Sequence, residues 1–214
     1  MDFKYLLLLR FCTINLGAVA LILAAWSQGL IKQVIAADVT GMVILICGVF
    51  TVGLFFAGWR IYKVSEQLNL AYNFDINIPS RASEYVKSAL GKDAASRANL
   101  ANALRLRMFS RVTHIRYIAN SLVVLGLIGT VLGFIIALSG VDPDVASNPS
   151  AISPMVATLI EGMSVALYTT LVGSILSVWL GLSYQILSTG ISNMVAKIIE
   201  LGEANSSAKK PVTR

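Results

Sequence analysis

Two threonines, Thr130 and Thr170, are the residues whose type and setting could support chemistry, because each places a hydroxyl in a long apolar run. If Tyr117 and Tyr184 mark one membrane interface, the hydroxyls lie 13 and 14 residues along their helices, a rise of ~20 and ~21 Å. They would then share nearly one depth in the outer half of the bilayer. Two interpretations remain open: a polar ring that passes a proton or a partly dehydrated cation, or hydrogen bonds to helix carbonyls worth ~1 kcal/mol.

Small residues accompany both threonines on one helical face. They recur at spacings of three and four in each run, and such faces let helix backbones approach closely in lipid, where no hydrophobic effect drives association. We therefore expect the runs 117–139 and 155–187 to pack as a helix pair. The residues expected at this contact are Gly126, Gly129, Gly133, Ala137, Ala166, Gly173 and Ser177.

The composition indicates that much of the chain lies in a bilayer. Hydrophobic residues make up 56% and charged residues 13%, with a mean hydropathy of +0.74, whereas soluble domains have ~45 to 50% and ~25%. The net charge of +6 comes mostly from Lys and Arg beside apolar runs, which favours membrane orientation over nucleic-acid binding. Cys12 and Cys47 lie inside apolar segments, and we interpret both as small buried hydrophobes.

Four apolar runs predict an all-α membrane protein with four transmembrane helices, at 11–30, 39–59, 117–139 and 155–187. The first two form a membrane anchor hairpin within residues 1–59, and the last two form a pore helix pair within 117–190. Ser153 as N-cap and Pro154 at the first helical position predict the start of the fourth helix.

The distribution of charge predicts that both chain termini are cytoplasmic. The loop 60–116 carries ten basic and four acidic residues, and the tail 191–214 also carries basic residues. The loop 141–150 has only Asp142 and Asp144 as charged residues. The positive-inside rule therefore assigns 60–116 and the tail to the cytoplasm.

The loop 60–116 contains a predicted helix that starts after the N-cap Ser80 and runs toward Arg111. Its basic residues either lie on a solvated helix packed against its neighbours, or form a surface that contacts another protein or lipid headgroups. Under the second interpretation, the residues that would couple the loop to movement are Arg97, Arg105, Arg107 and Arg111.

No acidic residue of this sequence can be assigned to mid-membrane. With Tyr184 at the inner interface, Glu161 lies near the outer one, as a solvated interfacial group or as a lip of the ion path. Coupling proton flow to work normally requires a titratable group inside the membrane. We therefore expect another chain to supply that group.

The motifs LGLIGTVLGF and GMSVALYTTLVGSILS resemble the paired signature of the MotA/TolQ/ExbB proton-channel family, over roughly residues 117–187. Four spans with cytoplasmic termini resemble the MotA/PomA branch. The resemblance implies a homopentamer around two copies of a single-span B-type subunit, similar to MotB, TolR or ExbD, whose membrane aspartate carries the proton. It also implies that Thr130 and Thr170 match the family's pore-facing threonines.

Three features depart from family members. The cytoplasmic loop is shorter than in flagellar stators, and Val123, Val124 and Leu125 replace the proline that precedes their GLIGT-like stretch. Where TolQ and ExbB have a glutamate before the AL of the fourth span, this chain has Val165, with Glu161 one turn earlier.

From these observations we expect a multi-pass protein of the bacterial inner membrane, the ion-channel or stator subunit of a complex driven by proton or sodium motive force. H⁺ or Na⁺ would pass Thr130, Thr170 and Glu161. We expect no enzyme activity, catalytic residue, metal site or cofactor; membrane lipid and the B-type chain are the expected partners. The alternatives are a subunit of a small-solute exporter and a membrane scaffold without an ion path.

Overall fold

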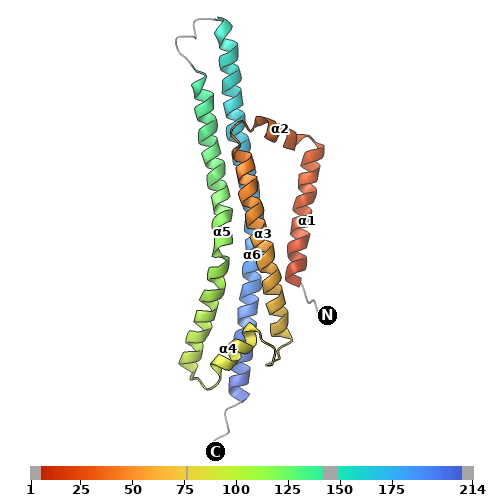
Figure 1. Ribbon diagram of the computed structural model, residues 1–214, viewed down its shortest axis with the longest axis vertical. Helices are drawn as coiled ribbons and strands as arrows, with labels where there is room; N and C mark the ends of the chain where they lie inside the picture. Colours follow the sequence, from red (N-terminus) through yellow and green to blue (C-terminus); the bar gives the residue numbers. More distant parts are fainter. Residues whose placement is uncertain (1–5, 76, 142–148, 209–214) are drawn as a thin grey trace, which may run out of the picture. The chain divides into compact units, whose positions relative to one another are not determined.

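The computed structural model describes residues 6–75, 77–141 and 149–208, which form six helices and no strand (Figure 1). In chain order these are α1 Leu6–Ser27, α2 Leu30–Ala37, α3 Met42–Tyr72, α4 Arg81–Ala89, α5 Ala94–Ser139 and α6 Pro149–Ala208. Four of them, α1, α3, α5 and α6, are long and apolar enough to cross a membrane. The all-α fold with four candidate spans is confirmed, and the orientation stays a prediction.

The predicted first span, 11–30, corresponds to α1, which begins and ends a few residues earlier, at Leu6 and Ser27. α1 ends at Ser27, and Gly29 adopts a left-handed conformation (φ 77°) before α2. After α2, the Asp38 carboxylate accepts hydrogen bonds from the backbone nitrogens of Val43 (3.0 Å) and Ile44 (3.4 Å), at the start of α3. Because a side-chain acceptor here satisfies amides that have no partner within the helix, Asp38 stabilises the start of α3.

The loop helix begins where the sequence predicts and ends earlier. Ser80 caps α4 in a reciprocal pair of hydrogen bonds with Ser83, which confirms the predicted N-cap. The prediction of one helix running from there toward Arg111 is wrong, because α4 ends at Ala89 and α5 begins at Ala94. Gly91 lies between them with φ 78°, a conformation that glycine adopts without steric cost.

The fourth long helix also begins earlier than predicted. α6 starts at Pro149 rather than after Ser153, and Pro154 lies inside it. A proline at the first helical position loses no hydrogen bond, because that amide has no partner within the helix. α6 then continues without interruption to Ala208, into the predicted tail. Asp142 and Asp144, which carry the predicted charge of the outer loop, lie outside the described residues.

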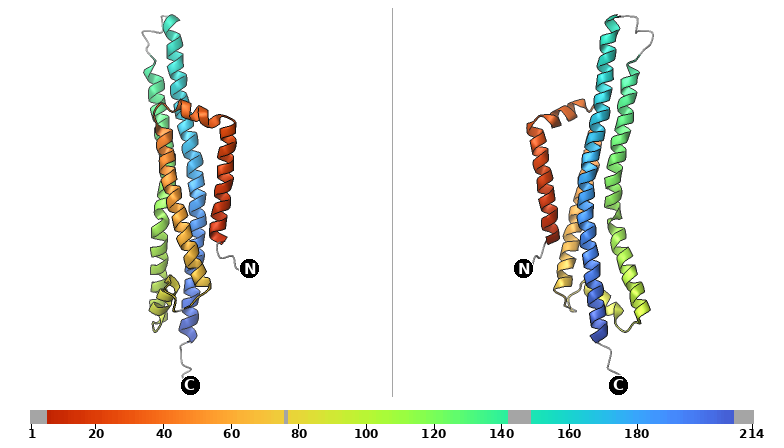
Figure 2. Two further views of the ribbon diagram at one scale, coloured as in Figure 1. Left: turned by 45° about the vertical axis from the view of Figure 1, so that its right-hand side comes forward. Right: turned by 180° about the vertical axis from the view of Figure 1, so that it is seen from behind.

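The chain divides into two compact units. The first, which we call the threonine unit, comprises Asn15–Phe55 and Ile115–Leu182. Within it α5 and α6 lie side by side (Figure 2). Its most buried large side chains come from α3, α5 and α6, namely Ile46, Leu122, Val165, Thr169 and Leu180.

The second, the basic unit, comprises Met1–Ile14, Phe56–His114 and Ser183–Arg214. Its core is built from α3, α4, α5 and the C-terminal part of α6. The most buried large residues are Ile61, Val86, Val112, Leu187, Ile191, Met194 and Ile198. α4 contacts all three neighbours: the Arg81 amide bonds Gln67, the Arg81 guanidinium contacts Met108, and Tyr85 lies against Gly202.

Large apolar side chains cover the outer surface of the threonine unit. Leu16, Ile44 and Leu167 are 76%, 71% and 69% exposed. Soluble monomers rarely expose extended apolar surface, so this surface suits lipid or neighbouring membrane chains. Cys12 and Cys47 are exposed as well. The prediction that both are buried is wrong, because an apolar residue of a membrane helix can face lipid as well as a protein core.

Candidate ion path

Glycines and alanines bring α5 and α6 into close contact within the threonine unit. A Cβ at Gly133 would lie 2.5 Å from the backbone nitrogen of Ala166 and 2.6 Å from the carbonyl oxygen of Gly162. A Cβ at Gly173 would lie 2.7 Å from the carbonyl oxygen of Leu122. Such distances leave no room for a side chain, so the absence of one permits backbone contact. The small-residue faces described from the sequence therefore meet each other.

Thr130 and Thr170 meet in this contact. Their hydroxyl oxygens share a hydrogen bond between α5 and α6. Each hydroxyl oxygen also lies within hydrogen-bond distance of the carbonyl oxygen of Gly126, at 3.2 Å from Thr130 Oγ1 and 3.1 Å from Thr170 Oγ1. A Cβ at Gly126 would lie 3.3 Å from Thr170 Cα, so this glycine keeps its carbonyl within reach of α6. The three oxygens form what we call the threonine cluster.

The threonine cluster can rearrange its hydrogen bonds without moving heavy atoms. Two hydroxyl hydrogens serve three oxygen contacts, because the Gly126 carbonyl only accepts. Either hydroxyl can therefore donate to the other, while the second donates to the carbonyl. Thr170 is exposed and Thr130 half-buried, so the cluster lies near the surface of the chain and not in its core. A hydroxyl does not titrate near neutral pH, so the cluster could bind or relay an ion but could not store its charge.

The neighbouring threonine has a different environment. Thr169 is fully buried, and its hydroxyl donates to carbonyls of its own helix, Val165 at 2.9 Å and Ala166 at 3.1 Å. It fills the space left by Gly129, where a Cβ would lie 2.5 Å from Thr169 Cβ. In the pair of adjacent threonines, therefore, one hydroxyl bonds only within α6 and the next bonds across to α5.

Glu161 lies apart from the threonine cluster. Its side chain is exposed, and it precedes Thr170 by nine residues of α6. At about 100° per residue this spacing puts the two side chains on opposite sides of the helix, ~13 Å apart along its axis. Its assignment to the ion path stays a prediction that the contacts within one chain do not support.

Two further polar contacts join helices of the threonine unit. Ser177 Oγ donates to the carbonyl oxygen of Ala119 at 2.7 Å, a second hydroxyl bond from α6 to α5. Trp179 Nε1 donates to Asn15 Oδ1 of α1 at 3.0 Å, and its ring lies 4.9 Å from that of Phe50. The sequence analysis did not single out Asn15, although an amide in the middle of an apolar run is a signal of a buried partner.

The four arginines predicted to couple movement have different environments in the basic unit. Arg97 forms a two-pronged ion pair with Glu203, with Nε–Oε1 at 2.9 Å and Nη2–Oε2 at 3.1 Å, which links α5 to α6. Arg105, Arg107 and Arg111 are exposed. Arg97 is thus engaged in an ion pair within the chain, whereas the other three form none among the described residues.

No group of three His, Cys, Asp or Glu residues that could hold a metal occurs in the described ranges. A family model, the MotA/TolQ/ExbB proton channel family, matches residues 74–200, more than half of the chain. The matched region contains the whole threonine cluster. Comparison with curated proteins and with solved structures gave no significant match. The chain, a multi-pass membrane protein by its apolar helices, belongs to the MotA/TolQ/ExbB proton channel family.

Proposed function

We propose that this chain is the ion-conducting subunit of a motor complex in the bacterial inner membrane, driven by proton or sodium motive force. The observation that carries the proposal is the threonine cluster, where two hydroxyls and one carbonyl meet between two apolar helices. Oxygens of this kind replace part of a cation's hydration shell and accept hydrogen bonds from a hydrated proton. Membership of a proton channel family supports the same function.

A second chain supplies the titrating group in this proposal. From residue 118 to 139 and from 162 to 182 the sequence contains no Asp, Glu, His, Lys or Arg. A proton carrier in the membrane needs a group that binds and releases H⁺. A single-span B-type partner with an aspartate at mid-membrane, two copies per complex, would place a carboxylate beside the exposed Thr170.

Several copies of the chain form a ring around that partner in this proposal. The exposed apolar side chains of the threonine unit give each copy surface for neighbours and for lipid. The homopentamer is the expectation from the family resemblance. A native mass measurement of the purified complex tests it, and a strictly monomeric particle would contradict both the ring and the ion path.

Ion flux in liposomes tests the function. The chain would be purified with the product of a neighbouring reading frame that encodes one apolar span with a central Asp. Flux would be followed with pH- or sodium-sensitive dyes under an imposed gradient. We expect Thr130→Val and Thr170→Val each to lower the flux at least tenfold, because valine keeps the shape and removes the hydroxyl. Thr170→Ser should retain flux, since the hydroxyl remains.

Ser177→Ala is the matched control. It removes a hydroxyl-to-carbonyl bond between the same two helices, outside the threonine cluster. Interhelical hydrogen bonds in membranes contribute on average ~0.6 kcal/mol, so all these variants should still assemble. Wild-type flux in both valine variants would contradict the proposed ion path. An equal loss of flux in Ser177→Ala would show that the threonines contribute only to helix packing.

A further inference from the structure

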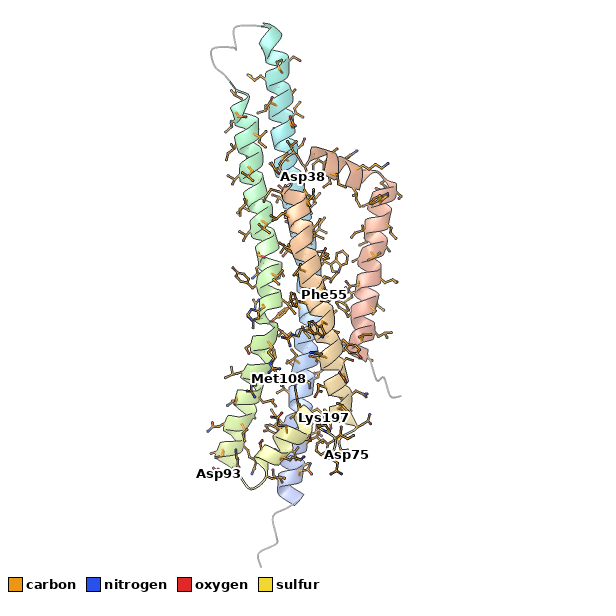
Figure 3. All side chains as sticks on the ribbon, viewed as in Figure 1. Asp38, Phe55, Asp75, Asp93, Met108 and Lys197 are labelled. Atoms are coloured by element: carbon orange, nitrogen blue, oxygen red, sulfur yellow. The ribbon has the colours of Figure 1, made fainter. Side chains whose placement is uncertain are left out.

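Four basic side chains line one small cleft of the basic unit, which we call the cation cleft. Arg60 and Lys63 come from α3, Arg81 from the start of α4 and Arg111 from α5. Apolar side chains form the rest of the lining, among them Met108, labelled on α5 in Figure 3. Three helices thus bring four positive charges to one place.

No carboxylate of the described residues forms an ion pair with the charges of the cation cleft. Among the described residues the ion pairs are Arg97–Glu203 and Lys197–Glu200, and neither includes a cleft residue. Arg81 Nη1 instead donates to the thioether sulfur of Met108 at 2.9 Å, a weak acceptor. Lys63 Nζ lies 4.8 Å from the centre of the Trp59 ring.

Repulsion among these charges acts on Arg81 in particular. Its guanidinium is half-buried, and its pKa is lowered by that burial and then by the positive charges of Arg111 and Arg60. Glu84, which is exposed, acts in the opposite direction with a smaller effect. An anion that bound at the cleft would relieve this repulsion.

The position of the cleft along α3 indicates the source of the anion. The residues before Arg60 are the apolar end of the second candidate span, and Trp59 closes that run. Trp at the end of a membrane span, followed by Arg and Lys, is typical of the headgroup level, and the basic loop assigns this end to the cytoplasm. Phosphates of anionic lipids occupy that level.

The size of the cleft favours a tethered ligand over a free ion. Its volume is about 20 Å³, which holds about one water molecule. A phosphate therefore cannot be enclosed and can only rest its oxygens against the four cations. A free ion gains little from such partial contact, whereas a phospholipid is already held at this level by its acyl chains, at high effective concentration.

We propose that the cation cleft binds the phosphate of an anionic phospholipid from the cytoplasmic leaflet, and that this lipid joins α3, α4 and α5. The proposal is independent of the threonine cluster, because lipid binding is measured without ion flux.

Lipid binding to the full-length chain tests the proposal. Delipidated protein in detergent would be titrated with phosphatidylglycerol or with zwitterionic phosphatidylcholine, and followed by native mass spectrometry and thermal unfolding. We expect phosphatidylglycerol to bind at one tight site per chain and to raise the unfolding temperature, and phosphatidylcholine to do neither. Arg81→Gln combined with Arg111→Gln should weaken that tight site at least tenfold.

Lys87→Gln is the control, since Lys87 is an exposed cation of α4 outside the cleft. If the double variant fails to fold, Lys63→Gln removes an exposed cleft cation and keeps the Arg81 contacts. Three outcomes would overturn the proposal: equal binding of both lipids, equal weakening by Lys87→Gln, or full replacement of the lipid effect by millimolar inorganic phosphate. The last outcome would assign the cleft to a free anion.

Discussion

Thr130 and Thr170 lie 40 residues apart in the sequence and share a hydrogen bond between α5 and α6. The carbonyl oxygen of Gly126 can accept from either hydroxyl, so a backbone group completes the cluster. The proposed path therefore depends on helix packing as much as on the two side chains. The small residues of the helix pair position the oxygens, and Thr170 itself is exposed at the surface of the chain.

Adjacent threonines of α6 should respond differently to the same substitution. We expect Thr169→Val to leave ion flux near wild type, because its buried hydroxyl bonds only carbonyls of its own helix. Stability should change by less than ~1 kcal/mol, since valine fills the same space. The liposome assay used for Thr170→Val gives the comparison. Equal loss of flux in the two variants would mean that packing, not the Thr170 hydroxyl, is responsible.

A methyl group at Gly133 should separate the helix pair. The added Cβ would lie 2.5 Å from the Ala166 nitrogen and 2.8 Å from its Cα, and backbone atoms cannot rotate away. We expect Gly133→Ala to destabilise the protein by ~1 to 3 kcal/mol or more, measured by thermal unfolding in detergent. Gly181→Ala is the control, because nothing lies within 4 Å of its added Cβ. Equal unfolding temperatures for both variants would contradict the close contact.

The ion pair between Arg97 and Glu203 should hold the end of α6 on α5. The Arg97→Glu or Glu203→Arg single variant should speed amide exchange in α6 near Glu203, since each puts like charges together. The double variant restores opposite charges and should recover most of the protection. Hydrogen exchange by mass spectrometry measures the protection of these amides. In the wild-type protein this protection should fall as the salt concentration rises. A double variant no better than either single variant would argue against a direct pair.

The Asp93 carboxylate should stabilise the first turn of α5 in a pH-dependent way. Hydrogen bonds from the Ser96 side chain and from the backbone amides of Ser96 and Ala95 lower the pKa of Asp93 below its ordinary value of 3.8. A depressed pKa means that the stabilisation is present above this value and is lost as the pH falls through the lower, folded pKa. We expect exchange protection of this turn, corrected for intrinsic rates, to fall in that acid range.

Two variants of Asp93 distinguish the effect of its capping hydrogen bonds from the effect of its negative charge. Asp93→Asn keeps a capping oxygen without a titrating group, so its protection should not follow this acid transition. Asp93→Ala removes the cap and should fray the turn at neutral pH as well. An acid transition of equal size in the Asn variant would show that another group titrates.

Features that depend on neighbouring residues in the sequence could be predicted, whereas features that depend on contacts between helices could not. Ser80 was identifiable as a cap because capping is decided within four residues, and the apolar runs predicted four candidate spans by length alone. The break at Gly91 and the start at Pro149 were not predicted. Each depends on a choice among several local conformations, which packing against neighbouring helices resolves.

The sequence by itself predicted a bilayer environment and one shared depth for the two threonines, and it contains no Asp, Glu, His, Lys or Arg at 118–139 or 162–182. Those properties depend on composition and on the fixed rise of a helix, which are local. Only the tertiary structure decided that the Gly126 carbonyl joins the threonines, that Thr169 turns inward, and that four cations from three helices meet in one cleft. These relationships depend on the distance and relative rotation at which helices far apart in the sequence pack. A local sequence pattern does not specify that geometry.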